Sequence, residues 1–173
     1  MLTHKNLIAQ YMSVILDGDL TEQDILVHAL PLFHSAQLHC FLGPHLYVGA
    51  SGTILEHAAP ALMLETVERY GATQLFCPPT VWIALLRSED FAARNLSSSQ
   101  KGYYGAAIMP VEIIKELCMR LPQSKLYNFY GQTEVAPLAT VLKPHDQLRK
   151  TGSAGKPALH VETKIVDESG NWV

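Results

Sequence analysis

The sequence predicts an α/β fold in which helices cover a mainly parallel β-sheet. Five stretches with strand character alternate with stretches of helical character, which is the order of parallel α/β proteins. The first, Asp24–Phe33, is an almost continuous apolar run, as expected for a strand covered on both faces. The last segment, His160–Val173, alternates and then turns at Ser169-Gly170. That pattern predicts a β-hairpin near the C-terminus of a flavodoxin-like sheet.

The first half of the chain is divided by glycine and proline. After the first strand, residues 35–48 fit an apolar helix that Gly43-Pro44 must interrupt or kink. Residues 53–57 fit a short strand. A helix is predicted next, because Pro60 suits the first helical position and Gly71 suits the C-terminal cap.

The second half continues the alternation. Residues 73–79 fit a strand that ends at prolines, and residues 80–88 fit a helix. Residues 102–107 fit a strand and turn. The clearest helix covers 110–122, where apolar residues recur at three- and four-residue steps between two prolines. Residues 125–131 fit the next strand.

Length and composition suit one globular domain with two parts. The chain has 173 residues, of which 48% are hydrophobic and only 17% charged, against about 25% charged in typical soluble domains. The low charge indicates a large core, or apolar surface that faces a part outside this chain. We expect residues 1–143 to form an α/β subdomain. Residues 144–173 would form a loop and the start of a β subdomain.

Composition also excludes several classes. The formal charge of −3 and the absence of basic runs argue against nucleic-acid binding. Cys40, Cys77 and Cys118 lack metal-ligand spacing and indicate a reduced, cytoplasmic protein. The N-terminus has no signal-peptide core, and no stretch approaches the roughly 20 apolar residues of a membrane span.

Four unusual turns follow the predicted parallel strands: "PLFHS", "CPPT", "YGAA" and "YGQTE". Ligands of open parallel sheets bind beyond the carboxyl ends of the strands. We therefore expect all four turns to open on one rim of the sheet.

The turn "YGQTE" contains the parts of a nucleotide site. Tyr130 offers a flat face for a base, and Gly131 allows close backbone approach. Thr133 carries a hydroxyl suited to a phosphate oxygen, and Glu134 is a hard oxygen ligand suited to Mg²⁺. An ordinary turn, with Thr133 capping the next helix, explains these residues equally well.

The other turns allow similar alternatives. The small residues after Tyr104 permit a flat ligand or close helix packing. His34 suits a carboxylate or phosphate partner, but most such histidines have ordinary hydrogen-bonding roles. Gly152–Pro157 is too short for a phosphate loop, and Ser51 lacks the spacing of a nucleophile elbow. The eight histidines form no zinc motif.

Six blocks in register resemble the AMP-forming acyl-CoA synthetases, within the adenylate-forming enzymes. "YNFYGQTE" resembles the family's Y-G-x-T-E motif. "MLTHKNL" resembles the segment that follows its phosphate loop. "ALPLFHSAQL", "CPPTVWIALL", "YYGAAIMP" and "TGSAGKPALHVETKIVD" are similar to its other blocks, in order. The family's Gly-Gly-Ala block is changed here, because Tyr104 precedes the glycine.

The resemblance implies a two-step reaction. Such enzymes join a carboxylate to the α-phosphate of ATP, release pyrophosphate, and pass the acyl group to the thiol of coenzyme A. It implies that Tyr130 stacks on adenine, that Thr133 contacts the α-phosphate, and that Glu134 binds Mg²⁺ and stabilises charge in the displacement.

The resemblance also assigns the acyl side. Gly105, Ala106 and Ala107 would form the adenine and acyl wall. Gly131 and Gln132 would flank the acyl carbonyl, and His34 would lie beside the carboxylate. Thr133, Glu134 and His34 would be the catalytic residues, and the nucleotide site would also include Gly105, Ala106, Ala107, Tyr130, Gly131 and Gln132.

The chain is expected to be a middle slice of such an enzyme. The phosphate loop would precede Met1, and the ribose-binding aspartate and the small C-terminal domain would follow Val173. We therefore expect no adenylation by this chain alone. Apolar edges left exposed would bury against a second copy.

The substrate is expected to be a plain carboxylic acid, because residues 30–35 lack the aspartate of amino-acid-activating relatives. The apolar stretch 35–50 would line an acyl channel, which suggests a fatty acid. Two alternatives remain: a non-catalytic acyl- or nucleotide-binding module, and an acyl-AMP ligase that loads a carrier-protein thiol.

Overall fold

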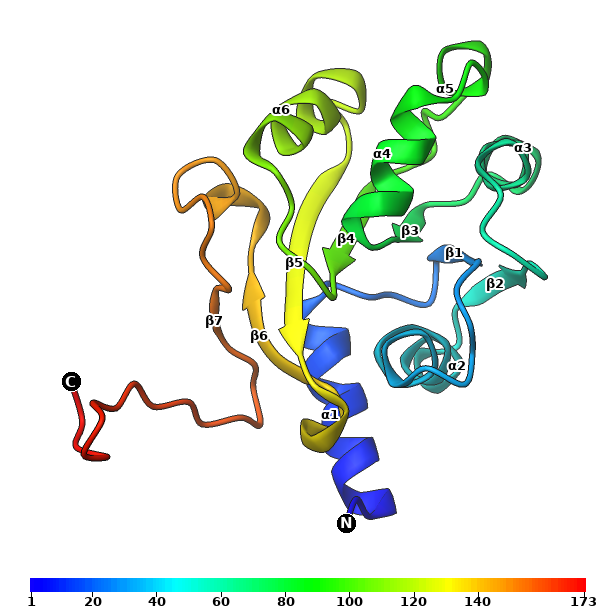
Figure 1. Cartoon of the computed structure of the whole chain (residues 1–173). Coiled ribbons are helices and arrows are strands. Elements are labelled where there is room, and N and C mark those ends of the chain that lie inside the picture. The colour runs from blue at the N-terminus through cyan, green and yellow to red at the C-terminus, as the bar shows by residue number, and fades with distance from the viewer.

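A computed structural model describes all residues, 1–173, and contains one seven-stranded sheet (Figure 1). The strand order is β2-β1-β3-β4-β5-β6-β7, and the first five of these are parallel. β6 runs antiparallel to β5, and β7 runs antiparallel to β6. The strands are β1 Ile25–His28, β2 Ser51–Ile54, β3 Gln74–Phe76, β4 Lys101–Gly105, β5 Lys125–Gly131, β6 Leu138–Leu142 and β7 Lys156–Pro157.

Helices cover both faces of this sheet, so the predicted fold class is confirmed (Figure 1). The α-helices are α1 His4–Asp17, α2 Gly43–Val48, α3 Pro60–Tyr70, α4 Pro79–Arg87, α5 Asp90–Ala93 and α6 Val111–Arg120. The π-helix η1 covers Ala36–Leu42, and the 3₁₀ turns η2 and η3 cover Thr133–Val135 and Pro144–Asp146.

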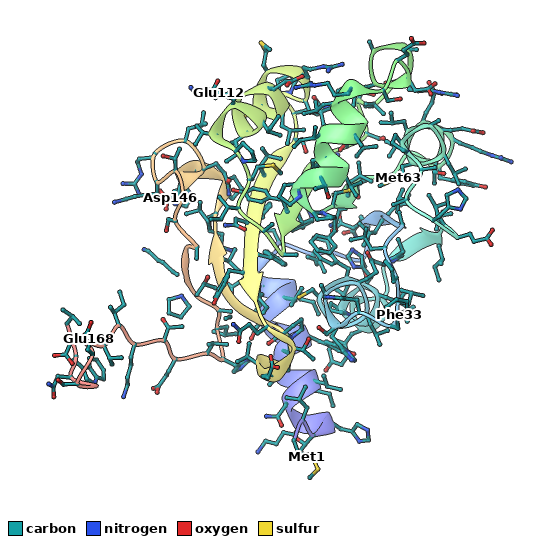
Figure 2. The ribbon with its side chains drawn as sticks, viewed as in Figure 1. Met1, Phe33, Met63, Glu112, Asp146 and Glu168 are labelled. Carbon is teal, nitrogen blue, oxygen red and sulfur yellow. The ribbon has the colours of Figure 1, made fainter.

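Two hydrophobic cores lie on opposite faces of the sheet. Neighbouring strand residues alternate between them, as the pleat requires. Tyr103 packs with the core under α1 and η1, whereas Tyr104 packs with the core under α3 to α6. Met63 and Trp82 are fully buried in the second core, and Figure 2 shows Met63 between the helices and the sheet. Burial on both faces explains the continuous apolar strands in the sequence.

An interruption or a kink was predicted at Gly43-Pro44, and the helix changes type there: the π-helix η1 ends at Leu42 and runs directly into α2. The Gly43 amide donates to the Leu38 carbonyl, which is a wide π-type turn, and Pro44 falls in the first turn of α2, where its missing N–H costs nothing. Gly43 also lies close to the Tyr11 ring, which a larger residue would have to displace. A Cβ there would lie 2.4 Å from Cζ of Tyr11.

Four helices or strands were not predicted: α1, α5, β6 and β7. α1 begins with a capping box between Thr3 and Asn6. Ile8, Met12 and Leu16 stay largely exposed along α1, and self-association through such apolar edges stays a prediction. The predicted C-terminal hairpin is reduced to one antiparallel bridge between Val166 and Trp172.

A buried ion pair lies at the amino-terminal ends of the parallel strands, opposite the four turns. The Lys101 ammonium lies 2.8 Å from Oδ2 of Asp24, and the two side chains are only 12% and 5% exposed. Burial acts to raise the pKa of Asp24, but hydrogen bonds from Lys101 and Thr21 and the lysine charge hold it below its usual value. Lys101 also donates to the Asp19 carbonyl, and Thr73 donates to Asp24.

Two histidines are buried between β1 and η1. Nδ1 of His28 lies 2.8 Å from the Gln37 amide nitrogen. His45 contacts the Phe41 carbonyl at 2.7 Å and the Gln74 amide oxygen at 2.9 Å. Burial, and then the charge of His45, lowers the pKa of His28 to about 4. The His28 ring is therefore a neutral structural group at pH 7.

We expect His28 to make folding acid-sensitive. Its pKa is lowered in the folded chain from an ordinary 6.5, so the unfolded chain binds the proton first. The stability is therefore complete above pH 6.5 and is lost as pH falls towards 4. Between pH 7.5 and pH 5 the expected loss is about 2 kcal/mol. Urea unfolding at both pH values measures it, and His28→Gln should reduce the difference by that amount. An unchanged difference would contradict this role for His28.

Candidate active site

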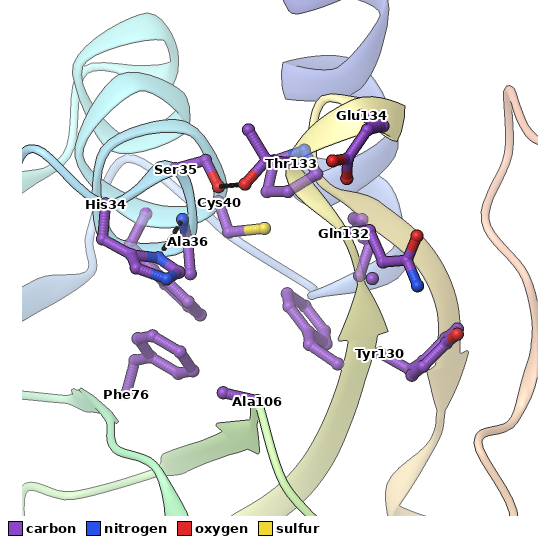
Figure 3. A pocket seen from close by; sticks show the side chains of 15 residues that line it. His34, Ser35, Ala36, Cys40, Phe76, Ala106, Tyr130, Gln132, Thr133 and Glu134 are labelled. Carbon is purple, nitrogen blue, oxygen red and sulfur yellow. Dashed lines mark hydrogen bonds between the residues drawn. The ribbon is translucent and has the colours of Figure 1, made fainter.

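The predicted rim exists, and three of its four turns line one cavity of about 340 Å³. His34 and Ala106 lie on one side of it, and the lip Tyr130–Glu134 lies on the other (Figure 3). From "CPPT", only the preceding Phe76 reaches this cavity. Gly105 ends β4 beside Phe129, and Ala107 lines a neighbouring cavity. Residues that are far apart in sequence thus meet at the carboxyl ends of the parallel strands.

Aromatic rings that were not predicted form the floor of this cavity. The Phe41 ring stacks on Phe76 with centroids 4.3 Å apart, and on Phe129 at 5.8 Å. All three line the cavity. From the stretch 35–50, only Ser35, Ala36, Cys40 and Phe41 reach it. His39 instead bonds to Tyr11 of α1, His45 bonds to Gln74 of the sheet, and Leu46 is exposed. No sequence signal distinguished Phe41 from its neighbours, because all of them are apolar.

The His34 ring is held by its own turn. The Ala36 amide donates to Nδ1 of His34 at 3.2 Å. In the neutral ring this hydrogen bond places the proton on Nε2. His34 therefore offers one hydrogen-bond donor to the cavity, which suits a carboxylate or carbonyl oxygen.

Ser35 ties the two sides of the cavity together and was missed in the sequence. Its Oγ lies 2.8 Å from Oγ1 of Thr133, as the dashed line in Figure 3 shows. Glu134 is exposed and makes no hydrogen bond or ion pair. Thr133 lies in the 3₁₀ turn η2 with Glu134, whereas the residue at its cap position is Gln132. The alternative of Thr133 as a helix cap is therefore wrong.

The two glycines of the rim are required by neighbouring backbone. A Cβ on Gly131 would lie 1.8 Å from the Pro137 carbonyl oxygen, and one on Gly105 would lie 2.2 Å from the Phe129 oxygen. The β5–β6 register also shifts between Tyr130 and Gly131, and such bulges re-aim side chains. Close strand packing, before any ligand contact, thus explains both glycines.

A second cavity of about 230 Å³ adjoins the first and shares Ala106, Phe129, Tyr130 and Gly131 with it. Ala106 has φ +65°, a left-handed conformation that costs an alanine roughly 1 kcal/mol. The rest of the lining combines the amide of Asn128 and small residues with larger apolar side chains, among them Ile108, Met109 and Ile114. Asn128, which the sequence did not single out, donates to the Ser153 carbonyl at 3.3 Å.

Tyr104 also reaches this second cavity, at the position where the sequence departs from the family pattern. Its hydroxyl donates to Oε1 of Gln147 at 2.6 Å. Burial raises the pKa of Tyr104 to about 12. The phenol therefore stays neutral and holds the cavity wall to the η3 turn.

Two motifs set aside in the sequence occupy ordinary positions in the fold. Ser51 begins strand β2. Gly152–Pro157 leads into β7 rather than a helix. No cluster of three or more histidine, cysteine or acidic residues is placed to hold a metal ion. Burial raises the pKa of Cys40 to about 12, which makes its thiol a poor nucleophile. None of the helices is both long and apolar enough to cross a bilayer.

Comparison with known families agrees with this arrangement. A family model described as AMP-binding enzyme matches residues 1–173. The chain belongs to the AMP-binding enzyme family. The putative acyl-CoA synthetase YngI of Bacillus subtilis (strain 168) is 33% identical over 170 residues, covering 96% of this chain and 31% of its own length. A feruloyl-CoA synthase of an Amycolatopsis species is 32% identical over 175 residues, covering 100% and 35%.

The fold of this AMP-binding chain also matches solved structures. The N-terminal domain of FACL13 from Mycobacterium tuberculosis superposes with a TM-score of 0.91 at 21% identity, covering 99% of this chain and 43% of that domain. At that identity the likeness concerns the fold alone. The chain spans about a third of the length of the curated relatives it matches.

Proposed function

We propose that this chain is the part of an ATP-dependent carboxylic acid–CoA ligase that holds the adenylate and the acyl carboxylate. The whole protein would form an acyl-adenylate, release pyrophosphate, and transfer the acyl group to coenzyme A in the cytoplasm. One observation carries the proposal: His34, Ala106 and the lip Tyr130–Glu134 line the same cavity. One ligand could therefore reach three groups: His34 as a donor for the carboxylate, the Tyr130 ring for the base, and the Thr133 hydroxyl for the phosphate.

The adenine ring is assigned to the second cavity. Its small walls at Ala106 and Ala107 leave room for a flat ligand beside the Tyr130 ring. The amide of Asn128 supplies both a donor and an acceptor, which suits the edge of a purine. The phosphate would then lie where the two cavities meet at Gly131, with Thr133 beside it in the first cavity.

Mg²⁺ is assigned to Glu134. The ion keeps several waters and is usually bound by one or two carboxylates together with substrate phosphates. The free carboxylate of Glu134 at the cavity edge fits this requirement, and its position beside Thr133 brings it close to a bound phosphate. When bound, the ion would neutralise phosphate charge. Thr133 would donate to the α-phosphate, held in place by Ser35.

The acyl group is assigned to the first cavity. His34 would donate from Nε2 to the substrate carboxylate, and Gly131 and Gln132 would flank the carbonyl. The apolar floor favours an uncharged chain, and we propose a fatty acid. The stacked rings of Phe41, Phe76 and Phe129 favour a second candidate, an aromatic acid. The similarity to a feruloyl-CoA synthase supports the same candidate. A panel of both acid classes, assayed on the whole protein, separates the two.

The tests below can also indicate one of two other functions. A binding module without catalysis would keep AMP affinity but would not need Glu134. An acyl-AMP ligase would form the adenylate but transfer its acyl group to a carrier-protein thiol. Lack of adenylation by the 173-residue chain alone stays a prediction, checked by pyrophosphate release from ATP and a fatty acid.

Tyr130→Ala should weaken AMP binding by roughly 5- to 150-fold, because stacking on a base contributes about 1–3 kcal/mol. Tyr130→Phe keeps the ring and should bind within threefold of the original chain. Calorimetric titration measures both. Tyr70→Ala is the matched control, since Tyr70 is similarly exposed but ends α3, outside both cavities. Equal AMP affinity in all three variants would refute the stacking role.

Glu134→Gln should lower adenylate formation by at least ~100-fold in a version of the protein extended to the length of its relatives. The amide keeps the shape of the side chain but cannot hold a cation as strongly. AMP affinity of the 173-residue chain should stay within threefold, which separates catalysis from folding. Full activity of the extended Glu134→Gln protein would favour a non-catalytic module.

A further inference from the structure

A third cavity, of about 420 Å³, lies between the end of α1 and the loop that joins β6 to β7. It shares only Ser153 with the second cavity and no residue with the first. Figure 2 shows Asp146 on this loop, well separated from Phe33 on the turn beside the first cavity. We propose that the third cavity binds a phosphate-bearing anion, independently of the adenylate site.

The lining of the third cavity is positively charged. Four cationic side chains, Lys143, Arg149, Lys150 and Lys156, line this cavity against two carboxylates, Asp17 and Asp146. Counting only the lysine, arginine and aspartate side chains, the lining therefore carries two excess positive charges, in a chain whose formal net charge is −3. Concentrated positive charge in a concave site attracts anions.

Two of these four cations are paired with carboxylates and two are not. Lys143 lies 3.6 Å from Oδ1 of Asp17, and Arg149 donates from Nε to Oδ1 of Asp146 at 2.8 Å. The side chains of Lys150 and Lys156 make no hydrogen bond or ion pair. Two ammonium groups with three donors each are thus free for an oxyanion.

The fold holds the backbone of the loop between β6 and β7 in place. Gly155 has φ +92°, and a Cβ there would lie 2.1 Å from the Val141 carbonyl carbon, so the loop packs directly on β6. The Asn128 amide and the Thr140 hydroxyl bind the carbonyls of Ser153 and Ala154. The loop is therefore held in place before a ligand arrives, which lowers the cost of binding.

The size of the cavity sets the ligand class. A volume of 420 Å³ far exceeds the ~30 Å³ share of one water and falls in the usual range of ligand sites. The unpaired Lys150 and Lys156 line this cavity together with Arg149. Three cations in one site suit an anion with two or more phosphate charges. A soluble diphosphate and the headgroup of an anionic lipid have this chemistry in common.

Inorganic pyrophosphate is the probe for the test. Titrated into ¹⁵N-labelled chain at low salt, it should shift the amide signals of Lys150, Ser153 and Lys156 in a saturable way. Lys150→Gln/Lys156→Gln should weaken that binding at least tenfold. The matched control, Lys5→Gln/Lys115→Gln, removes two exposed lysines elsewhere and should leave it within twofold. Excess AMP should not displace pyrophosphate from these residues.

Three results would overturn the proposal. One is an absence of saturable shifts in this loop both with pyrophosphate and with vesicles containing phosphatidic acid. Another is an equal loss of affinity in the two double variants, which would indicate a general charge effect. The third is displacement by AMP together with shifts at Tyr130 and Thr133, which would place the anion in the adenylate site. Loop shifts with pyrophosphate indicate a soluble ligand, and loop shifts with vesicles alone indicate a lipid headgroup.

Discussion

Lys101→Met should destabilise the fold by about 3–5 kcal/mol, because it leaves the buried Asp24 carboxylate without its cation. Methionine retains most of the length of the lysine chain, so the loss reports charge pairing rather than volume. The hydrogen bond to the Asp19 carbonyl disappears as well. Urea unfolding at pH 7 gives the free energy of unfolding of both proteins.

The matched control for this change is Lys115→Met. Lys115 lies 2.9 Å from Glu112 on α6, but the two side chains are 57% and 80% exposed, so the expected loss is below about 1 kcal/mol. Adding Asp24→Asn to Lys101→Met should restore part of the stability, because the buried charge is then removed. Equal, small losses for the two lysine variants would mean that the buried pair does not hold the amino-terminal ends of the parallel strands.

Gly131→Ala should be the most damaging small change at the rim, with a loss of about 3 kcal/mol or more. The new Cβ would lie 1.8 Å from the Pro137 carbonyl oxygen and 3.1 Å from the Ala139 amide nitrogen. Both are backbone atoms, so the β5–β6 connection must move, and the lip Tyr130–Glu134 moves with it. Thermal unfolding and AMP titration of the same variant measure the two effects.

Gly49→Ala provides the control for this glycine. Gly49 has φ +84°, and no atom lies within 4 Å of the position that a Cβ would take, so its cost is conformational only, roughly 1 kcal/mol. AMP binding should be unchanged, because Gly49 caps α2 away from the rim. If Gly131→Ala were as stable as Gly49→Ala, the close backbone packing at β5 and β6 would not be the reason for the glycine.

The sequence predicted the parts of the fold where local chemistry and burial agree. Pro60 and Gly71 do bound α3, with Gly71 in the left-handed conformation. α1 was missed because its buried face carries Gln10 and Ser13, which blur the apolar period. β6 was missed although all five of its residues are buried, because an antiparallel return directly after the site breaks the strand–helix alternation.

Some residues of the candidate site could be predicted from the sequence and others could not. The residues that end strands were predictable, because parallel strands place their carboxyl ends at one rim. His34, Ala106 and Tyr130 meet there as expected. Phe41 and Ser35 were not predictable, because their positions depend on how η1 packs over the sheet, which local pattern does not specify. Their roles follow only from tertiary contacts.

The central claim is that AMP lies across this rim, with its base beside Tyr130. Titration of ¹⁵N-labelled chain with AMP, followed by amide chemical shifts, tests it most directly. We expect saturable shifts at Ala106, Asn128, Tyr130 and Thr133, and none around the Lys101 ion pair, at the opposite ends of the parallel strands. Saturable shifts confined to other parts of the molecule, with the rim unchanged, would contradict it.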